Sequence, residues 1–317
     1  MVGVNLNEGS MAYPIFFQNG VQTAPKNNIP KGVEVSDQEI LCLKIQSNVQ
    51  LDQPIRIIFH QDIPSDLQSK HVILQLEKNA HASVSFEYHG ENVTYQRATK
   101  IEIQLAAGAE LECYELQRES MQCQHSVRMH VQQKENSRFF LYQLQIGCAQ
   151  IREDILVTLE EKNAQADCSG LYILREKQKM VLALKMNHLA QKTRSEQYYK
   201  GILFGESEGT WDSRVHVYPA AAQSISRQKN QNLVLSRGAI IHTKPELEID
   251  HDDVSCAHGA TIGNLDEEAF FYLRSRGIPE KMAYDLLIEA FTIEMLERFK
   301  NAELKICFRQ HLDALPI

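Results

Sequence analysis

The chain has 317 residues, of which 43% are apolar and 23% charged, a composition typical of a globular protein with a substantial core. Its net charge of −8 is opposite in sign to the basic surface that non-specific nucleic-acid binding requires. No apolar run approaches the length of about 18 residues that a membrane-spanning helix needs. We therefore expect neither nucleic acid nor a membrane among its partners.

The seven cysteines are widely spaced, and no two of them form a Cys-x-x-Cys pair. An odd number at such spacings predicts neither a disulfide framework nor a zinc finger. The N-terminal stretch also lacks the basic and long apolar regions of a signal peptide. These features favour a reduced, cytoplasmic protein. Most of the cysteines, including Cys113 and Cys168, are interpreted as small core residues.

Residues 1–35 are expected to form a separate N-terminal segment, with a short apolar strand at 12–17 and turns at 19–20 and 29–32. From about 36 to 262 the pattern is almost entirely β. Apolar and polar residues alternate in runs such as 55–59, 72–76 and 155–159. This period of two predicts strands with one buried face.

A repeat runs through this β region. Turn-forming residues recur at intervals of 29, 28 and 27 residues, at Asn79, Gly108, Asn136 and Asn163. Gly209 and Gly238 are candidates for continuing the series. Short strands with a turn at a nearly constant period are what a parallel β-helix requires, because each turn of the coil buries its inward residues against its neighbours. An antiparallel sandwich would also contain many short strands, and the pattern alone leaves both open.

Residues 263–317 are predicted to form a small helical subdomain. Asp266 is a suitable N-cap, Gly277 a suitable terminator, and Pro279 a suitable start for the next helix. Apolar residues then recur every four positions, at Ala283, Leu287, Phe291, Met295 and Phe299. About 40 residues cannot build a core alone, so these helices must pack on the last turns of the β region or on another protein.

The Cys256-Ala257-His258-Gly259 motif lies between the β region and the helices. Side chains two apart on a strand share a face, so Cys256 and His258 are expected to point the same way. A thiolate beside an imidazole suits iron, zinc or copper, although two ligands do not complete a coordination sphere. On spacing alone, a structural role is favoured for this pair. The preceding His251-Asp252-Asp253 run is interpreted as a turn cap.

The stretch from Leu247 to Gly277, LEIDHDDVSCAHGATIGNLDEEAFFYLRSRG, resembles the SufB/SufD family of iron–sulfur cluster assembly scaffolds. The Cys-x-His-Gly form is similar to the SufD members rather than to SufB. Ala257 is a departure, since many members have serine there. The resemblance covers roughly residues 14–300 and is strongest after 185. The helical region that precedes this core in the family has no counterpart in the sequence.

The resemblance implies a right-handed parallel β-helix with a small C-terminal helical subdomain. It further implies a non-catalytic scaffold that pairs with SufB and binds the ABC-type ATPase SufC. Cys256 and His258 would serve iron entry or cluster assembly, with a transient Fe–S cluster or iron at the partner interface. The residues expected to contact SufC are Phe270, Tyr272, Arg276, Leu287, Phe291 and Met295. The chain has no P-loop, so we expect no bound nucleotide.

Two other functions remain open. The chain could be the main cluster scaffold, like SufB, acting alone or as a homodimer. Alternatively, β-helices also serve as carbohydrate-active enzymes, which place carboxylates along a solvent-exposed groove.

Overall fold

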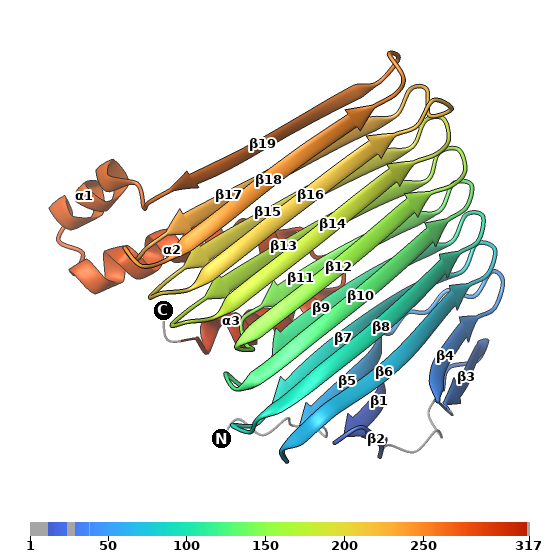
Figure 1. Ribbon diagram of the computed structural model, residues 1–317, viewed down its shortest axis with the longest axis horizontal. Coiled ribbons are helices and arrows are strands. Elements are labelled where there is room, and N and C mark those ends of the chain that lie inside the picture. Colours follow the sequence, from blue (N-terminus) through green and yellow to red (C-terminus); the bar gives the residue numbers. More distant parts are fainter. Residues whose placement is uncertain (1–11, 24–28, 38, 316–317) are drawn as a thin grey trace.

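The computed structural model describes residues 12–23, 29–37 and 39–315, which form a parallel solenoid of two sheets followed by helices (Figure 1). In spatial order, sheet A contains β2 (Val21–Gln22), β1 (Tyr13–Gln18), β5 (Ile55–Gln61), β7 (His81–Gly90), β9 (Glu110–Arg118), β11 (Arg138–Gln145), β13 (Gln165–Leu174), β15 (Arg194–Leu203), β17 (Ile225–Val234) and β19 (Ser255–Gly263). Sheet B contains β3 (Val33–Asp37), β4 (Ile40–Ile45), β6 (Ser65–Leu76), β8 (Tyr95–Leu105), β10 (Cys123–Gln133), β12 (Gln150–Leu159), β14 (Lys179–His188), β16 (Glu208–Val217) and β18 (Ile240–Ile249).

The chain visits the two sheets alternately, and each long strand pairs in parallel with the strands one turn before and after it. Cys113, for example, lies opposite Val84 on one side and Leu141 on the other. In the described residues only β1–β2 and β3–β4 pair antiparallel. The prediction of a parallel β-helix is confirmed, and the sandwich alternative is wrong. Strands β1 and β3, from the expected N-terminal segment, extend the same two sheets.

The predicted turn series is confirmed at its four positions, Asn79, Gly108, Asn136 and Asn163. Each of these residues has a left-handed backbone, with φ between 57° and 71°. Asparagine tolerates this conformation better than most residues. The stacked side chains also hydrogen-bond: Asn163 Nδ2 donates to Asn136 Oδ1 at 2.9 Å.

The series continues at Lys192 and Gln223, with φ of 59° and 60°, and not at Gly209 or Gly238. Gly209 is buried inside β16, where a Cβ would come within 2.7 Å of the Ile241 side chain. It is therefore a packing glycine and not a turn residue. Gly238 belongs to the turn between β17 and β18, on the opposite side of the solenoid.

Inward side chains from both sheets form one long apolar core. Cys113 and Cys168 are fully buried in it, as predicted. Strands of sheet B alternate between buried and exposed residues, whereas β9 of sheet A is buried on both faces. Something must therefore cover the outer face of sheet A.

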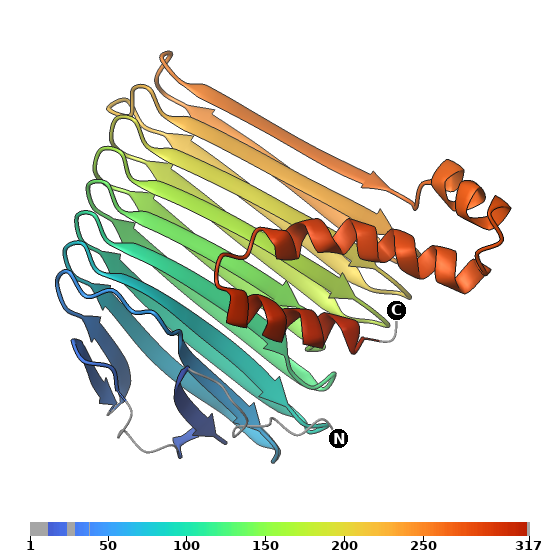
Figure 2. The ribbon, with the colours of Figure 1, turned by 180° about the vertical axis from the view of Figure 1, so that it is seen from behind.

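That cover is the C-terminal subdomain, made of α1 (Glu267–Ser275), α2 (Glu280–Glu297) and α3 (Ala302–Asp313). Asp266 caps α1 by accepting two backbone N–H groups, and Gly277 is left-handed with φ 84°, both as predicted. Helices α2 and α3 lie across sheet A (Figure 2). They form a second core with strands β9, β11, β13 and β15, in which Tyr114 and Tyr142 contact Phe299.

Hydrogen bonds and ion pairs hold α2 against sheet A. The buried Lys200 ammonium donates to the Phe291 carbonyl at 2.8 Å and to Glu294 at 2.5 Å. Arg298 binds Asp167 and Glu196, each at 2.9 Å. The helices therefore cover the middle turns of the solenoid, whereas we expected them to pack on the last turns or on another protein. None of the helices in the described part of the chain combines the length and hydropathy needed to cross a bilayer.

Candidate functional site

The solenoid ends at an open turn formed by β18 and β19. Among the described residues β19 pairs only with β17, and β18 only with β16. Nearly every residue of β19 is exposed. An edge strand presents unpaired N–H and C=O groups that can hydrogen-bond another strand. This end of the molecule can therefore hydrogen-bond a strand of a partner protein.

Cys256 and His258 lie on this edge strand, in register with Ser226 and Gln228 of β17. Those two side chains are buried inside the solenoid, so Cys256 and His258 share the inward face of an uncapped turn, as the alternation predicts. Cys256 packs against the end of the core and is half-buried, whereas His258 is exposed.

Burial raises the pKa of the Cys256 thiol, and a hydrogen bond with the Ser226 backbone partly opposes the shift. The thiol is therefore protonated near neutral pH and is not, by itself, an activated thiolate. Within the described residues, neither Cys256 nor His258 belongs to a group of three clustered metal-ligating side chains. A metal ion bound by Cys256 and His258 would need further ligands from outside the described residues.

Polar side chains fill the interior beneath Cys256, where a core built for stability alone would be apolar. Ser226 Oγ lies 2.9 Å from Ser195 Oγ, which is 2.8 Å from His188 Nε2. The other ring nitrogen of His188 is 2.8 Å from Thr193 Oγ1. Burial lowers the pKa of His188 to about 4, so the ring is neutral under ordinary conditions.

The side chains of Ser226, Ser195 and His188 thus form one stack of polar residues inside the solenoid, and a second such column lies beneath His258. Gln228 Nε2 donates to Ser213 Oγ at 2.6 Å, and Ser213 in turn contacts Gln197. Sequence reasoning missed both columns. The signal was present, since Ser195, Gln197 and Gln228 occupy inward strand positions that are apolar in earlier turns.

The acidic turn that precedes β19 has the structural role favoured from sequence. The Asp253 backbone N–H donates to His251 Nδ1 at 3.0 Å, which caps the turn. His216 lies on the outer face and binds Asp250 at 2.8 Å. These groups shape the turn, and within the described residues they form no cluster of three metal-ligating side chains with Cys256 or His258.

The residues expected to contact SufC divide into two groups. Tyr272 is 56% exposed on α1, and the Arg276 guanidinium lies 5.0 Å from its ring centre. Helix α1 has no buried residue and extends beyond the solenoid (Figure 2), which leaves its apolar side chains, Phe270 among them, without a core of their own.

On α2 the situation differs. Leu287 and Phe291 are partly buried, and Met295 is fully buried against sheet A. Met295 therefore cannot contact a partner directly in this arrangement, and that part of the expectation is corrected. Sequence reasoning did not include Phe271 among the expected contacts, although it is 74% exposed.

Fold and open end together define a parallel β-solenoid protein with a helical subdomain laid over one sheet and a free strand edge. The sequence profile described as "SUF system FeS cluster assembly, SufBD core domain" matches residues 59–291. This chain belongs to the SufBD core family of iron–sulfur cluster assembly proteins.

Individual relatives agree with this membership. The chain is 31% identical over 282 residues to the SufBD family protein slr0076 of Synechocystis, covering 84% of this chain and 61% of the relative. It is 28% identical over 233 residues to the iron–sulfur cluster assembly protein SufD of Escherichia coli, covering 73% and 55%. It is 26% identical over 287 residues to the chloroplastic protein ABCI7 of Arabidopsis thaliana, covering 87% and 60%. The chain thus spans less than two thirds of the length of these relatives.

Proposed function

We propose that this chain acts as a non-catalytic, SufD-like scaffold subunit of a SUF cluster assembly complex. It pairs with a SufB-type subunit, binds the ATPase SufC, and aids iron acquisition and cluster assembly. The observation that carries the proposal is the open last turn, where an unpaired strand edge presents Cys256 and His258 together. Family membership favours this function over the carbohydrate-active alternative.

Pairing through β19 would follow the general mode of strand addition, in which main-chain hydrogen bonds provide affinity. Ile262 on β19 and Ile249 on β18 are 54% and 43% exposed, and a partner strand would bury them. Apart from its chain neighbours, a Cβ added at Gly259 or Gly263 would meet no atom of the described residues within 4 Å, and neither residue is left-handed. Packing within this part of the chain therefore does not require glycine there, whereas close approach of another backbone would.

The iron or nascent cluster is cargo at this interface. Cys256 supplies a soft sulfur donor and His258 an imidazole, which together suit iron. Additional ligands come from the SufB-type partner. Because the Cys256 thiol is protonated in the isolated chain, a metal ion or a cationic group of the partner must favour the thiolate.

The ATPase contact is assigned to α1 and the adjoining part of α2. Phe271, Tyr272 and Met282 are each more than half exposed. Exposed aromatic side chains next to arginines are typical of interaction surfaces. Movement of α1 relative to the solenoid would carry SufC's conformational change to the neighbouring end of β19, since only residues 264–266 separate the two elements.

Co-expression with the SufB and SufC of the same organism tests the assembly. We expect wild type to purify with both partners. Phe271→Asp with Tyr272→Asp should lose SufC alone, whereas Ile306→Asp, which changes a 60% exposed residue on α3, should lose nothing. Ile262→Asp should lose SufB, whereas Leu67→Asp, which changes a 58% exposed residue far from the open end, should retain it. A wild-type chain that purifies with neither partner would contradict the proposal.

Iron and sulfide content of the assembled complex tests the cargo site. We expect His258→Ala and Cys256→Ala to reduce both without releasing SufB or SufC. Anaerobic reconstitution of the chain alone separates the SufD-like function from the SufB-like one. A stable cluster on the isolated chain or its homodimer would identify it as the main scaffold.

A further inference from the structure

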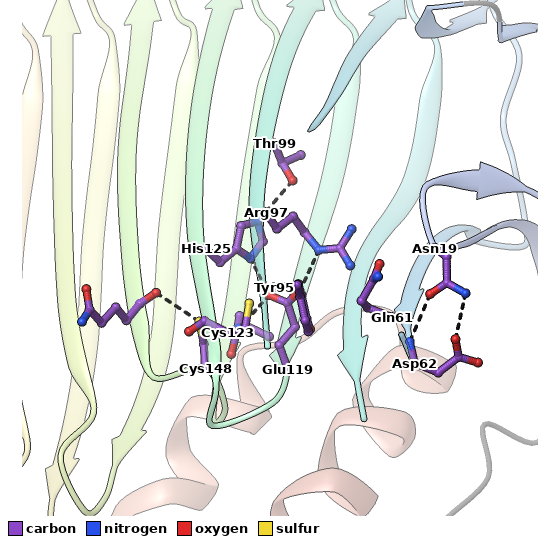
Figure 3. A network of polar contacts seen from close by, with 12 residues as sticks. Asn19, Gln61, Asp62, Tyr95, Arg97, Thr99, Glu119, Cys123, His125 and Cys148 are labelled. Carbon is purple, nitrogen blue, oxygen red and sulfur yellow. Dashed lines mark hydrogen bonds and ion pairs between the residues drawn. The ribbon is translucent and has the colours of Figure 1, made fainter. Parts of the chain in front are cut away.

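Two cysteines meet in the middle of the solenoid, several turns before the open end. Cys123 begins β10, and Cys148 lies in the turn before β12. Both are fully buried. Their sulfur atoms and a carboxylate oxygen of Glu119 all lie within 4.8 Å of one another (Figure 3). This juxtaposition is separate from Cys256 and His258.

The backbone at Cys148 is held in an unfavourable conformation. Its φ of 67° lies in the left-handed region, which costs an ordinary side chain roughly 1–2 kcal/mol. Asparagine or glycine would relieve that cost. A Cβ at the neighbouring Gly147 would come within 2.6 Å of the Glu119 backbone, so the turn is pressed against residue 119. The Cys148 thiol donates to the Cys123 and Gln150 carbonyls, each at 3.1 Å, so the strained turn holds this sulfur in a fixed place beside Cys123.

Glu119 is oriented by four side chains. Its Oε1 accepts hydrogen bonds from Tyr95 at 3.0 Å and from Arg97 Nε at 2.7 Å. Its Oε2 accepts from Gln117 at 3.0 Å and lies 2.7 Å from His125 Nδ1. Carboxylates that ligate metals are usually fixed in this way by surrounding hydrogen bonds.

We propose that Cys123, Cys148 and Glu119 bind one thiophilic divalent metal ion, of which Zn²⁺ and Fe²⁺ best suit two thiolates and a carboxylate. Two sulfurs around a tetrahedral zinc are separated by roughly 3.8 Å, so the donor atoms need to contract only slightly. The Tyr95 hydroxyl hydrogen-bonds both Glu119 and the Cys123 thiol, so it directly contacts two of the three donors.

Charge balance supports a divalent ion. The two thiolates and Glu119 carry three negative charges, which the Arg97 guanidinium and a divalent ion neutralise. Buried charges are tolerated when they are compensated in this way. Met121, in the turn between β9 and β10 that leads into Cys123, is 40% exposed and carries a further soft sulfur atom.

Titration of the metal-free, fully reduced chain with Co²⁺ tests the site. Thiolate-to-cobalt charge transfer reports sulfur ligation, and the visible bands report tetrahedral geometry. We expect one Co²⁺ per chain in wild type and in Cys256→Ser, which isolates this site from the open end. Cys168→Ser, which changes a buried thiol elsewhere in the core, should also retain it.

Cys148→Gly is the decisive variant, because glycine accepts a left-handed φ and the variant should fold as well as wild type. We expect it to lose the charge-transfer band while keeping its unfolding temperature. Glu119→Gln should weaken binding by at least about tenfold. Absence of a thiolate band in wild type would overturn the proposal, as would a band that persists in Cys148→Gly. A Cys123–Cys148 disulfide in oxidised protein, with no metal binding after reduction, would identify a redox pair instead.

These outcomes are independent of the proposed scaffold function. Loss of the cobalt band in Cys148→Gly would leave SufB and SufC binding intact, because the site lies in the solenoid interior away from β19 and α1.

Discussion

His188 makes the turns beneath the candidate site sensitive to acid. Its ring is completely buried, and among the described residues its two nitrogens hydrogen-bond with the hydroxyls of Thr193 and Ser195. Burial lowers its pKa from 6.5 to about 4. The folded protein therefore resists protonation of a group that the unfolded chain protonates readily.

The sign of the effect follows from proton uptake. Between about pH 6.5 and pH 4 the unfolded chain binds a proton at His188 that the folded chain does not, so stability falls as the pH falls. The contribution is fully present above about pH 6.5. Since one pKa unit corresponds to 1.36 kcal/mol, the loss is about 2 kcal/mol at about pH 5 and about 3 kcal/mol once both states are protonated.

Urea unfolding at about pH 8 and about pH 5 measures this loss. Trp211 is the single tryptophan, is fully buried, and lies on β16 next to the strand that carries His188. Its fluorescence therefore reports the relevant turns. Wild type should lose about 2 kcal/mol more than His188→Gln between the two pH values. The exposed His242 provides a control, since His242→Gln should behave like wild type.

Other groups also respond to acid. His311, in the last turn of α3, has its pKa lowered to about 4 by burial and by nearby cationic groups. The difference between wild type and His188→Gln removes such common contributions. Equal acid losses in the two proteins would show that burial of His188 is not the cause and would refute the reasoning.

Three further predictions concern stability. Asn136 has a left-handed φ of 59°, so Asn136→Gly should be nearly neutral and Asn136→Ala should cost about 1 kcal/mol, as measured by thermal unfolding. Phe308→Ala should cost roughly 3–5 kcal/mol and expose α3 to limited proteolysis, because Phe308 is fully buried against Tyr114; unchanged protease resistance would contradict this. Arg56→Met should cost roughly 3–5 kcal/mol by removing the guanidinium from the buried Glu87 carboxylate, which then keeps only its contacts with Ser85 and His89. Adding Glu87→Gln should restore most of the stability in a double-mutant cycle.

The repeat could be predicted because its signal is local. An asparagine or glycine with a left-handed backbone marks one corner of each turn, and this preference depends on a few residues only. The α1 cap at Asp266 and the terminator at Gly277 could be predicted for the same reason. Alternation also placed Cys256 and His258 on one face of one strand.

Strand boundaries between 36 and 150 were harder to predict, because the alternation breaks down in sheet A. Strand β9 is buried on both faces, with Glu115 and Gln117 inside and Tyr114 and Leu116 beneath the helices. A strand covered on both sides has no polar face to mark its period. Its double burial is a consequence of helices that follow nearly two hundred residues later.

The sequence by itself determined the coil, its period, the corner residues, the helix caps and the Cys-x-His pair on the last strand. Only the tertiary structure decided that α2 lies on the middle turns, which buries Met295 and leaves Phe271 free. It also decided that Cys123 and Cys148 meet beside Glu119. The physical reason is that backbone preferences act over a few residues, whereas contacts between turns depend on register, which is set by packing along the whole solenoid.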